Sequence, residues 1–108
     1  MKDAPAPQMT HLPNGLTVVT QDMPGFRTVS AGVWVQAGTR NEMPDEHGLA
    51  HFLEHMALKG TATRSAHRIV EEIENVGGDL NASTTVENTN YHVRLMGEDL
   101  PVAMDIFA

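Results

Sequence analysis

The chain has 108 residues, a length typical of one domain with a single hydrophobic core. Apolar residues make up 41% and charged residues 19%, which is the composition of a soluble globular protein. The net charge of −7 argues against nucleic acid and anionic membranes as partners, and the absence of cysteine excludes disulfides and thiolate metal ligands.

The first eight residues, MKDAPAPQ, alternate Ala and Pro and predict a flexible lead-in over residues 1–8. They contain no apolar core of a signal peptide. No segment of the sequence reaches the roughly 20 apolar residues that a membrane span needs. The sequence therefore favours a cytoplasmic location without determining it, and it predicts no membrane partner and one domain over residues 9–108.

Strand patterns follow the lead-in. Two short β-type runs, residues 9–12 and 16–21, flank an Asn-Gly pair that supplies the positive φ angles of a tight hairpin turn. Residues 28–38 contain three valines and the lone Trp34. This run predicts a third, more buried strand.

Helices and strands alternate in the rest of the chain. The predicted elements are a helix over 46–59, a helix over 66–76, strands over 79–85 and 88–96, and a helix over 98–108. Gly60 suits the end of the first helix, and Ser65 suits the N-cap of the second. Together these elements predict an α+β fold, in which an antiparallel-rich sheet packs against helices in two layers.

The first of these helices carries the chain's most unusual pattern, HGLAHFLEHMALKG, at residues 47–60. Four apolar side chains have the i, i+3, i+4, i+7 spacing that predicts a core-facing stripe: Leu49, Phe52, Leu53 and Met56. His51, Glu54 and His55 fall on the opposite side. Because residues four apart on a helix project side by side, His51 and His55 can place two imidazole nitrogens on one metal ion, with Glu54 beside it.

A solvated helix face that carries histidine without any metal is one alternative. A shuffled chain of this composition would contain H-x-x-E-H about once in forty cases, so the pattern alone is moderate support. A solvated face would also mix Lys, Arg and Glu, whereas this one has no cation before Lys59. The pattern therefore favours a metal site, and a non-catalytic metal- or partner-binding module stays open as the second alternative.

Zinc is the metal that suits these residues. A catalytic Zn²⁺ takes three protein ligands, often histidine nitrogen and carboxylate oxygen, and keeps one position open for water. The ion lowers the pKa of that water, so a nearby carboxylate can remove its proton. In this interpretation His51 and His55 are zinc ligands and Glu54 is the catalytic base, which is the inverzincin arrangement.

The run GTRNEMPDEHGLAHFLEHMALKGT resembles the zinc-binding segment of the insulinase/pitrilysin family of inverzincin peptidases, in its processing-peptidase-like branch. The likeness extends to LPNGLTVV, RIVEEIENVGGDLNASTTVENTNYHV and GEDLPVAMDIFA, which together cover nearly all of the chain after residue 8. The resemblance implies a zinc endopeptidase that hydrolyses peptide bonds of extended polypeptides. It also implies a subunit that works as a homo- or hetero-oligomer.

The resemblance assigns roles to further residues. Asn81, Ala82 and Ser83 match the edge strand that pairs with the substrate backbone, and Glu87 matches an acidic position with a supporting role. For Asn81 and Glu87 the alternative is ordinary strand-end and turn chemistry. His47 is expected to be a helix-start residue rather than a third zinc ligand.

The resemblance also implies that parts of the site lie elsewhere. The family's third zinc ligand is a glutamate on a helix beyond the point that matches Ala108, and the groups that stabilise the oxyanion come from a more C-terminal half. The chain thus resembles the truncated, incomplete first domain of a peptidase subunit. We expect the 108 residues to be inactive alone and to self-associate through uncovered apolar surface.

Overall fold

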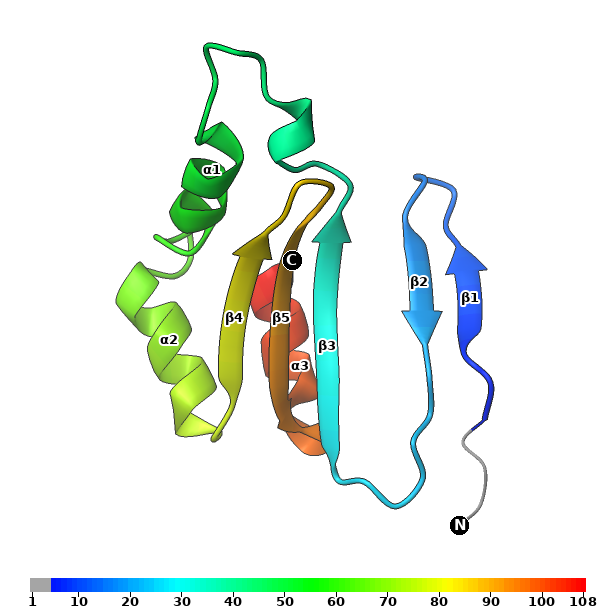
Figure 1. Ribbon diagram of the computed structural model, residues 1–108. Coiled ribbons are helices and arrows are strands. Elements are labelled where there is room, and N and C mark those ends of the chain that lie inside the picture. The colour runs from blue at the N-terminus through cyan, green and yellow to red at the C-terminus, as the bar shows by residue number, and fades with distance from the viewer. Residues whose placement is uncertain (1–4) are drawn as a thin grey trace.

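The computed structural model describes residues 5–108, which form two antiparallel sheets and three α-helices (Figure 1). The strands are β1 (Gln8–His11), β2 (Thr17–Thr20), β3 (Thr28–Val35), β4 (Asp79–Thr84) and β5 (Thr89–Met96). The α-helices are α1 (Leu49–Ala57), α2 (Ala66–Asn75) and α3 (Leu100–Phe107), and single 3₁₀ turns occur at η1 (Thr39–Asn41) and η2 (Gly97–Asp99). The predicted α+β fold is confirmed, whereas the predicted lead-in over 1–8 lies partly outside the described residues.

The main sheet is antiparallel and has the strand order β3-β5-β4. Its register pairs Val93 of β5 with Ala31 on one side and Leu80 on the other, so these three apolar side chains share one face. The opposite face is more polar, and there Asn81 pairs with His92. The β1–β2 hairpin forms a separate two-stranded sheet beside β3 (Figure 1).

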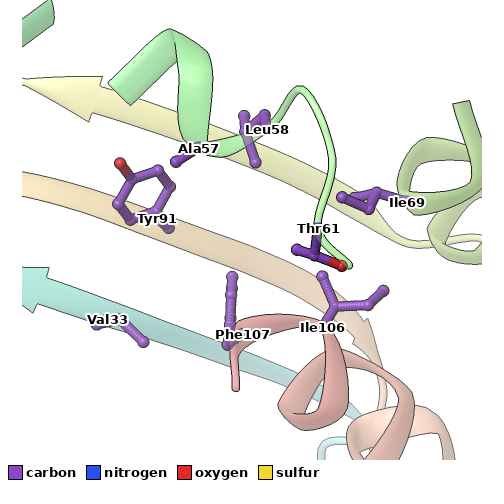
Figure 2. A pocket seen from close by; sticks show the side chains of 8 residues that line it. All are labelled: Val33, Ala57, Leu58, Thr61, Ile69, Tyr91, Ile106 and Phe107. Atoms are coloured by element: carbon purple, nitrogen blue, oxygen red, sulfur yellow. The ribbon is translucent and has the colours of Figure 1, made fainter. Parts of the chain in front are cut away.

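The helices cover the apolar face of the main sheet. The core lies between these two layers and consists of Ile73 of α2, Ala103 of α3, and Val93 and Leu95 of β5, each at most 3% exposed. An adjoining apolar pocket of about 200 Å³ is lined by residues from β3, β5, all three helices and the loop after α1: Val33, Ala57, Leu58, Thr61, Ile69, Tyr91, Ile106 and Phe107 (Figure 2). All three helices therefore lie on the same side of the sheet.

Helix α2 begins at the predicted cap. Ser65 Oγ accepts a hydrogen bond from the backbone N–H of Arg68 at 3.1 Å, which satisfies one of the free donors of the first turn. The neighbouring Arg64 joins α2 to α3, because its guanidinium contacts Glu72 at 2.5 Å and Asp105 at 2.6 Å. The hydrogen bond from Arg64 lowers the pKa of Glu72, so Glu72 carries its charge at neutral pH.

Several side chains that the sequence pattern placed in the core are exposed. The stripe on α1 is 46–66% exposed at all four positions: Leu49, Phe52, Leu53 and Met56. Strand β3 was expected to be more buried, yet Trp34 is 62% exposed. The spacing identified the apolar face of α1 correctly, but α1 turns a different side toward the sheet, and no neighbour within residues 5–108 buries the stripe.

No helix in the described part of the chain is both long and apolar enough to cross a membrane.

Candidate active site

The N-terminus of α1 is fixed by Glu42, a residue of the preceding loop. Its carboxylate oxygens accept hydrogen bonds from the backbone N–H groups of Leu49 at 3.1 Å and Gly48 at 3.4 Å. These donors lack partners within the helix, and a carboxylate is also favoured at the positive end of the helix dipole. The helix starts at Leu49 rather than at the predicted residue 46, because Gly48 has a φ of +88° and interrupts the helical backbone.

His51 and His55 lie on exposed surface of α1, one turn apart. Their spacing puts both imidazole rings on the same side of the helix. Within residues 5–108 no three side chains of the types His, Asp and Glu come together in a set that could hold a metal ion. The structure therefore brings His51 and His55 together without a third side chain of these types. His47 was expected to start the helix, but it lies in an exposed turn two residues before α1 begins.

Glu54 faces the sheet instead of the solvent. Its Oε2 accepts a hydrogen bond from the hydroxyl of Thr84, the last residue of β4. Burial raises the pKa of Tyr91 in β5, and the nearby negative charge of Glu54 raises it further. Tyr91 and Ala57 of α1 also line the same pocket, as Figure 2 shows. Glu54, which precedes His55 in the sequence, thus joins α1 to the end of β4.

The predicted substrate-binding residues lie on β4, the strand whose last residue, Thr84, bonds to Glu54. β4 is an edge strand, since among residues 5–108 it pairs only with β5. The side chain of Ala82 is partly buried toward the helices, whereas those of Asn81 and Ser83 are exposed on the other face. An extended peptide can pair with an unpartnered edge of this kind.

Glu87 lies in the turn between β4 and β5, which is fastened to the segment before α1. The backbone N–H groups of Thr39 and Arg40 donate to the carbonyl oxygens of Thr85 and Val86, at 3.1 and 2.9 Å. Glu87 adds a 3.2 Å ion pair with Arg40, in which both side chains are more than 60% exposed. Together these three contacts form a brace between the β4–β5 turn and the segment before α1. Exposed ion pairs contribute little to stability, so the two backbone hydrogen bonds are the stronger part of this brace.

Sequence reasoning missed two residues that shape the site, Glu42 and Thr84. Both contacts join residues that no helix or strand period relates: Glu42 reaches Leu49 seven residues later, and Thr84 reaches Glu54 thirty residues earlier. A signal for Glu42 was present, because it lies inside the run that carries the family resemblance. Thr84 directly follows the three residues assigned to the edge strand.

The family model described as insulinase (peptidase family M16) matches residues 17–108. The chain therefore belongs to the insulinase family of peptidases, and the resemblance read from the sequence is confirmed. Among its relatives is the mitochondrial-processing peptidase subunit beta of Lentinula edodes, 47% identical over 104 residues, which are 96% of this chain and 22% of that protein. An uncharacterised zinc protease of Mycobacterium tuberculosis is 49% identical over 103 residues, 95% of this chain and 24% of that protein.

A solved structure supports the same relationship. The crystal structure of a protease from Helicobacter pylori matches with a TM-score of 0.91 and 29% sequence identity, over 97% of this chain and 26% of that one. The chain thus spans about a quarter of the length of the proteins that it matches.

Proposed function

We propose that this chain carries the catalytic helix and the substrate-binding edge of a zinc-dependent endopeptidase of the processing-peptidase type. The observation that supports this most strongly is the arrangement around Glu54. Its carboxylate is held against the end of the edge strand β4, while His51 and His55 on the same helix stay exposed. Two metal ligands, a base and a peptide-pairing edge then lie close to one another.

The donor set fits zinc. His51 and His55 offer imidazole nitrogens four residues apart, and imidazole is a ligand that zinc binds well. When bound, zinc acts as a Lewis acid and makes a water molecule acidic enough to lose a proton near neutral pH. The family resemblance implies that a glutamate outside these 108 residues completes the ligand set.

The residues of this chain then have separate roles. Glu54 takes the proton from the attacking water and passes it to the leaving amine. The backbone of Asn81, Ala82 and Ser83 binds the substrate as an added strand, which keeps it extended. Glu87 has a minor supporting role through its exposed ion pair with Arg40, which joins the β4–β5 turn to the segment before α1.

A non-catalytic metal- or partner-binding module is the second candidate. It is favoured by one observation, namely that residues 5–108 bring together no set of three metal ligands. Against it stands Glu54, because a purely structural metal site needs no carboxylate held beside its histidines. With only two ligands, we expect the 108-residue chain to bind zinc weakly and to be inactive as a peptidase by itself.

Calorimetric titration with zinc tests the metal site. We expect the 108-residue chain to bind one zinc ion, and His51→Ala to weaken binding by more than the roughly tenfold that loss of an outer hydrogen-bond partner costs. His67→Ala is the matched control, because His67 lies on a different helix, α2, and its 88% exposed side chain contacts Glu71 of that helix, so the zinc affinity of this variant should be unchanged. The absence of binding by both the unmodified chain and His51→Ala would rule out the site in this chain.

We also propose that the isolated chain pairs with a second copy through α1. Four large apolar side chains on one short helix are uncovered, and their burial against another copy would be favourable. We expect sedimentation at micromolar concentration to show dimers or larger species, and the double variant Phe52→Ser, Leu53→Ser to be monomeric. Val86→Ser, at a similarly exposed position in the β4–β5 turn, should still associate. A monomeric unmodified chain would contradict this proposal.

We propose that these 108 residues belong to a longer peptidase subunit, called the parent protein below, and that the parent protein works together with a partner subunit. Support comes from the relatives named mitochondrial-processing peptidase subunit beta. The cytoplasmic location stays a prediction from the sequence, and the same relatives favour testing a mitochondrial location beside it.

A further inference from the structure

The contact between Thr84 and Glu54 has no role in the mechanism above. We propose that Thr84 is a positioning residue for Glu54, an inference that rests on the proposed peptidase function. The Thr84 hydroxyl donates to Oε2 of Glu54. This bond restrains the carboxylate and leaves its other oxygen, Oε1, to take up the proton. A hydrogen bond to a carboxylate is stronger than one between neutral groups.

The position of Thr84 in the sheet makes it suitable for this role. Its backbone pairs with Thr89 of β5, so the direction of its side chain is set by the strand. Along β4 the side chains of Ala82 and Thr84 alternate with exposed ones and are partly buried on the helix side. A glutamate on a helix otherwise has several free torsions, and one fixed partner removes much of that freedom before the reaction begins.

Thr84 also connects the base to the strand proposed to hold the substrate. In the described part of the chain, the Thr84–Glu54 bond is the one side-chain hydrogen bond between α1 and the main sheet. The apolar stripe of α1 does not fix the helix against the sheet, because it is exposed. This threonine therefore joins Glu54 directly to the strand proposed to hold the peptide.

Three variants test the proposal in the zinc-loaded parent protein. Thr84→Val keeps the shape of the side chain and removes the hydroxyl, and Thr84→Ser keeps the hydroxyl. For Thr84→Val we expect kcat to fall by about 10- to 100-fold, part of the roughly 10²–10⁴ that a positioned base contributes, with KM changed less than about twofold. Thr84→Ser should recover most of the loss. Thr28→Val on β3, the same substitution far from Glu54, should leave kcat unchanged.

Two further measurements do not depend on activity. Zinc affinity should be the same in Thr84→Val as in the unmodified protein, because the histidines are untouched. In NMR spectra of the 108-residue chain, the side-chain couplings of Glu54 should show one rotamer in the unmodified chain and in Thr84→Ser, and rotamer averaging in Thr84→Val. The melting temperature reports folding, and Thr84→Ala replaces Thr84→Val if the latter unfolds.

Two results would overturn the proposal: an unchanged kcat in Thr84→Val, whether or not KM rises, or equal losses of kcat in the valine and serine variants. The failure of the proposed function gives a different result. An unmodified parent protein that cleaves no peptide removes both proposals, whereas an active protein with a fully active Thr84→Val removes only this one.

Discussion

The Glu54→Gln substitution is expected to abolish peptide hydrolysis by the parent protein while its zinc stays bound. An amide is nearly the same size as a carboxylate but cannot take up the proton of the attacking water. Because general-base catalysis contributes about 10²- to 10⁴-fold, kcat should fall by at least that factor. The glutamine oxygen can still accept the hydrogen bond from Thr84, so the position of α1 should not change. Cleavage of an unstructured peptide, followed by chromatography, measures the effect.

Glu71→Gln on α2 is the matched control for this variant. Its carboxylate contacts His67 four residues away on the same helix and is 55% exposed, so the change removes one charge without reaching the site. Both variants should retain the zinc content of the unmodified protein. If Glu54→Gln cleaves the peptide as fast as the Glu71→Gln control, Glu54 is not the base, and the non-catalytic interpretation of the motif gains support.

The sequence predicted those parts of the fold whose signal is local. The strand predicted over 88–96 is present as β5, and in it the buried Val93 and Leu95 lie on either side of the exposed Arg94, because neighbouring side chains of a strand point to opposite faces. Ser65 was recognised as the cap of α2 from its residue type and position alone. The H-x-x-E-H spacing likewise brought His51 and His55 to one side of α1, since a helix repeats every 3.6 residues.

Burial and long-range contacts could not be predicted in the same way. The period of α1 shows that Phe52 and Leu53 share a face, but burial also needs a neighbour, which no local pattern specifies. Thr84 gives no local sign that it bonds to Glu54, because that contact exists only after β4 has paired with β5 and α1 has packed beside it. The shared side of His51 and His55 was therefore predictable from a single helix, whereas the contact of Glu54 depends on the tertiary fold.

The substitution with the largest expected effect on folding is Gly38→Ala. Gly38 is buried, and a Cβ atom there would lie 2.7 Å from the carbonyl oxygen of Val86 and still closer to that of Thr85. Neither oxygen can move easily, because they accept the backbone hydrogen bonds of Arg40 and Thr39, respectively. The backbone of Gly38 is extended, with a φ of −147°, so steric overlap is the cause and not φ strain.

We expect Gly38→Ala to lower the free energy of unfolding by about 2–4 kcal/mol, as overpacking against fixed atoms does. Urea denaturation followed by circular dichroism measures it. Gly97→Ala is the control, because the nearest atom to a Cβ there is a backbone oxygen at 3.3 Å and the φ angle is not positive, so its cost should be much smaller. Equal stability of the two variants would show that the turn is not braced at Gly38.

Gly38→Ala should also disturb the candidate site. The backbone hydrogen bonds of Thr39 and Arg40 to the β4–β5 turn join two segments, and each of them continues into the site. Gly38 precedes the segment in which Glu42 caps α1, and the turn that it touches follows directly after Thr84. If the turn is displaced, both ends of the support for Glu54 move. Amide hydrogen exchange in Gly38→Ala should therefore become faster at Thr39 and Leu49 before it changes in the core of β5, because local opening precedes global unfolding. Uniformly faster exchange would instead mean that the brace stabilises the whole fold rather than the site.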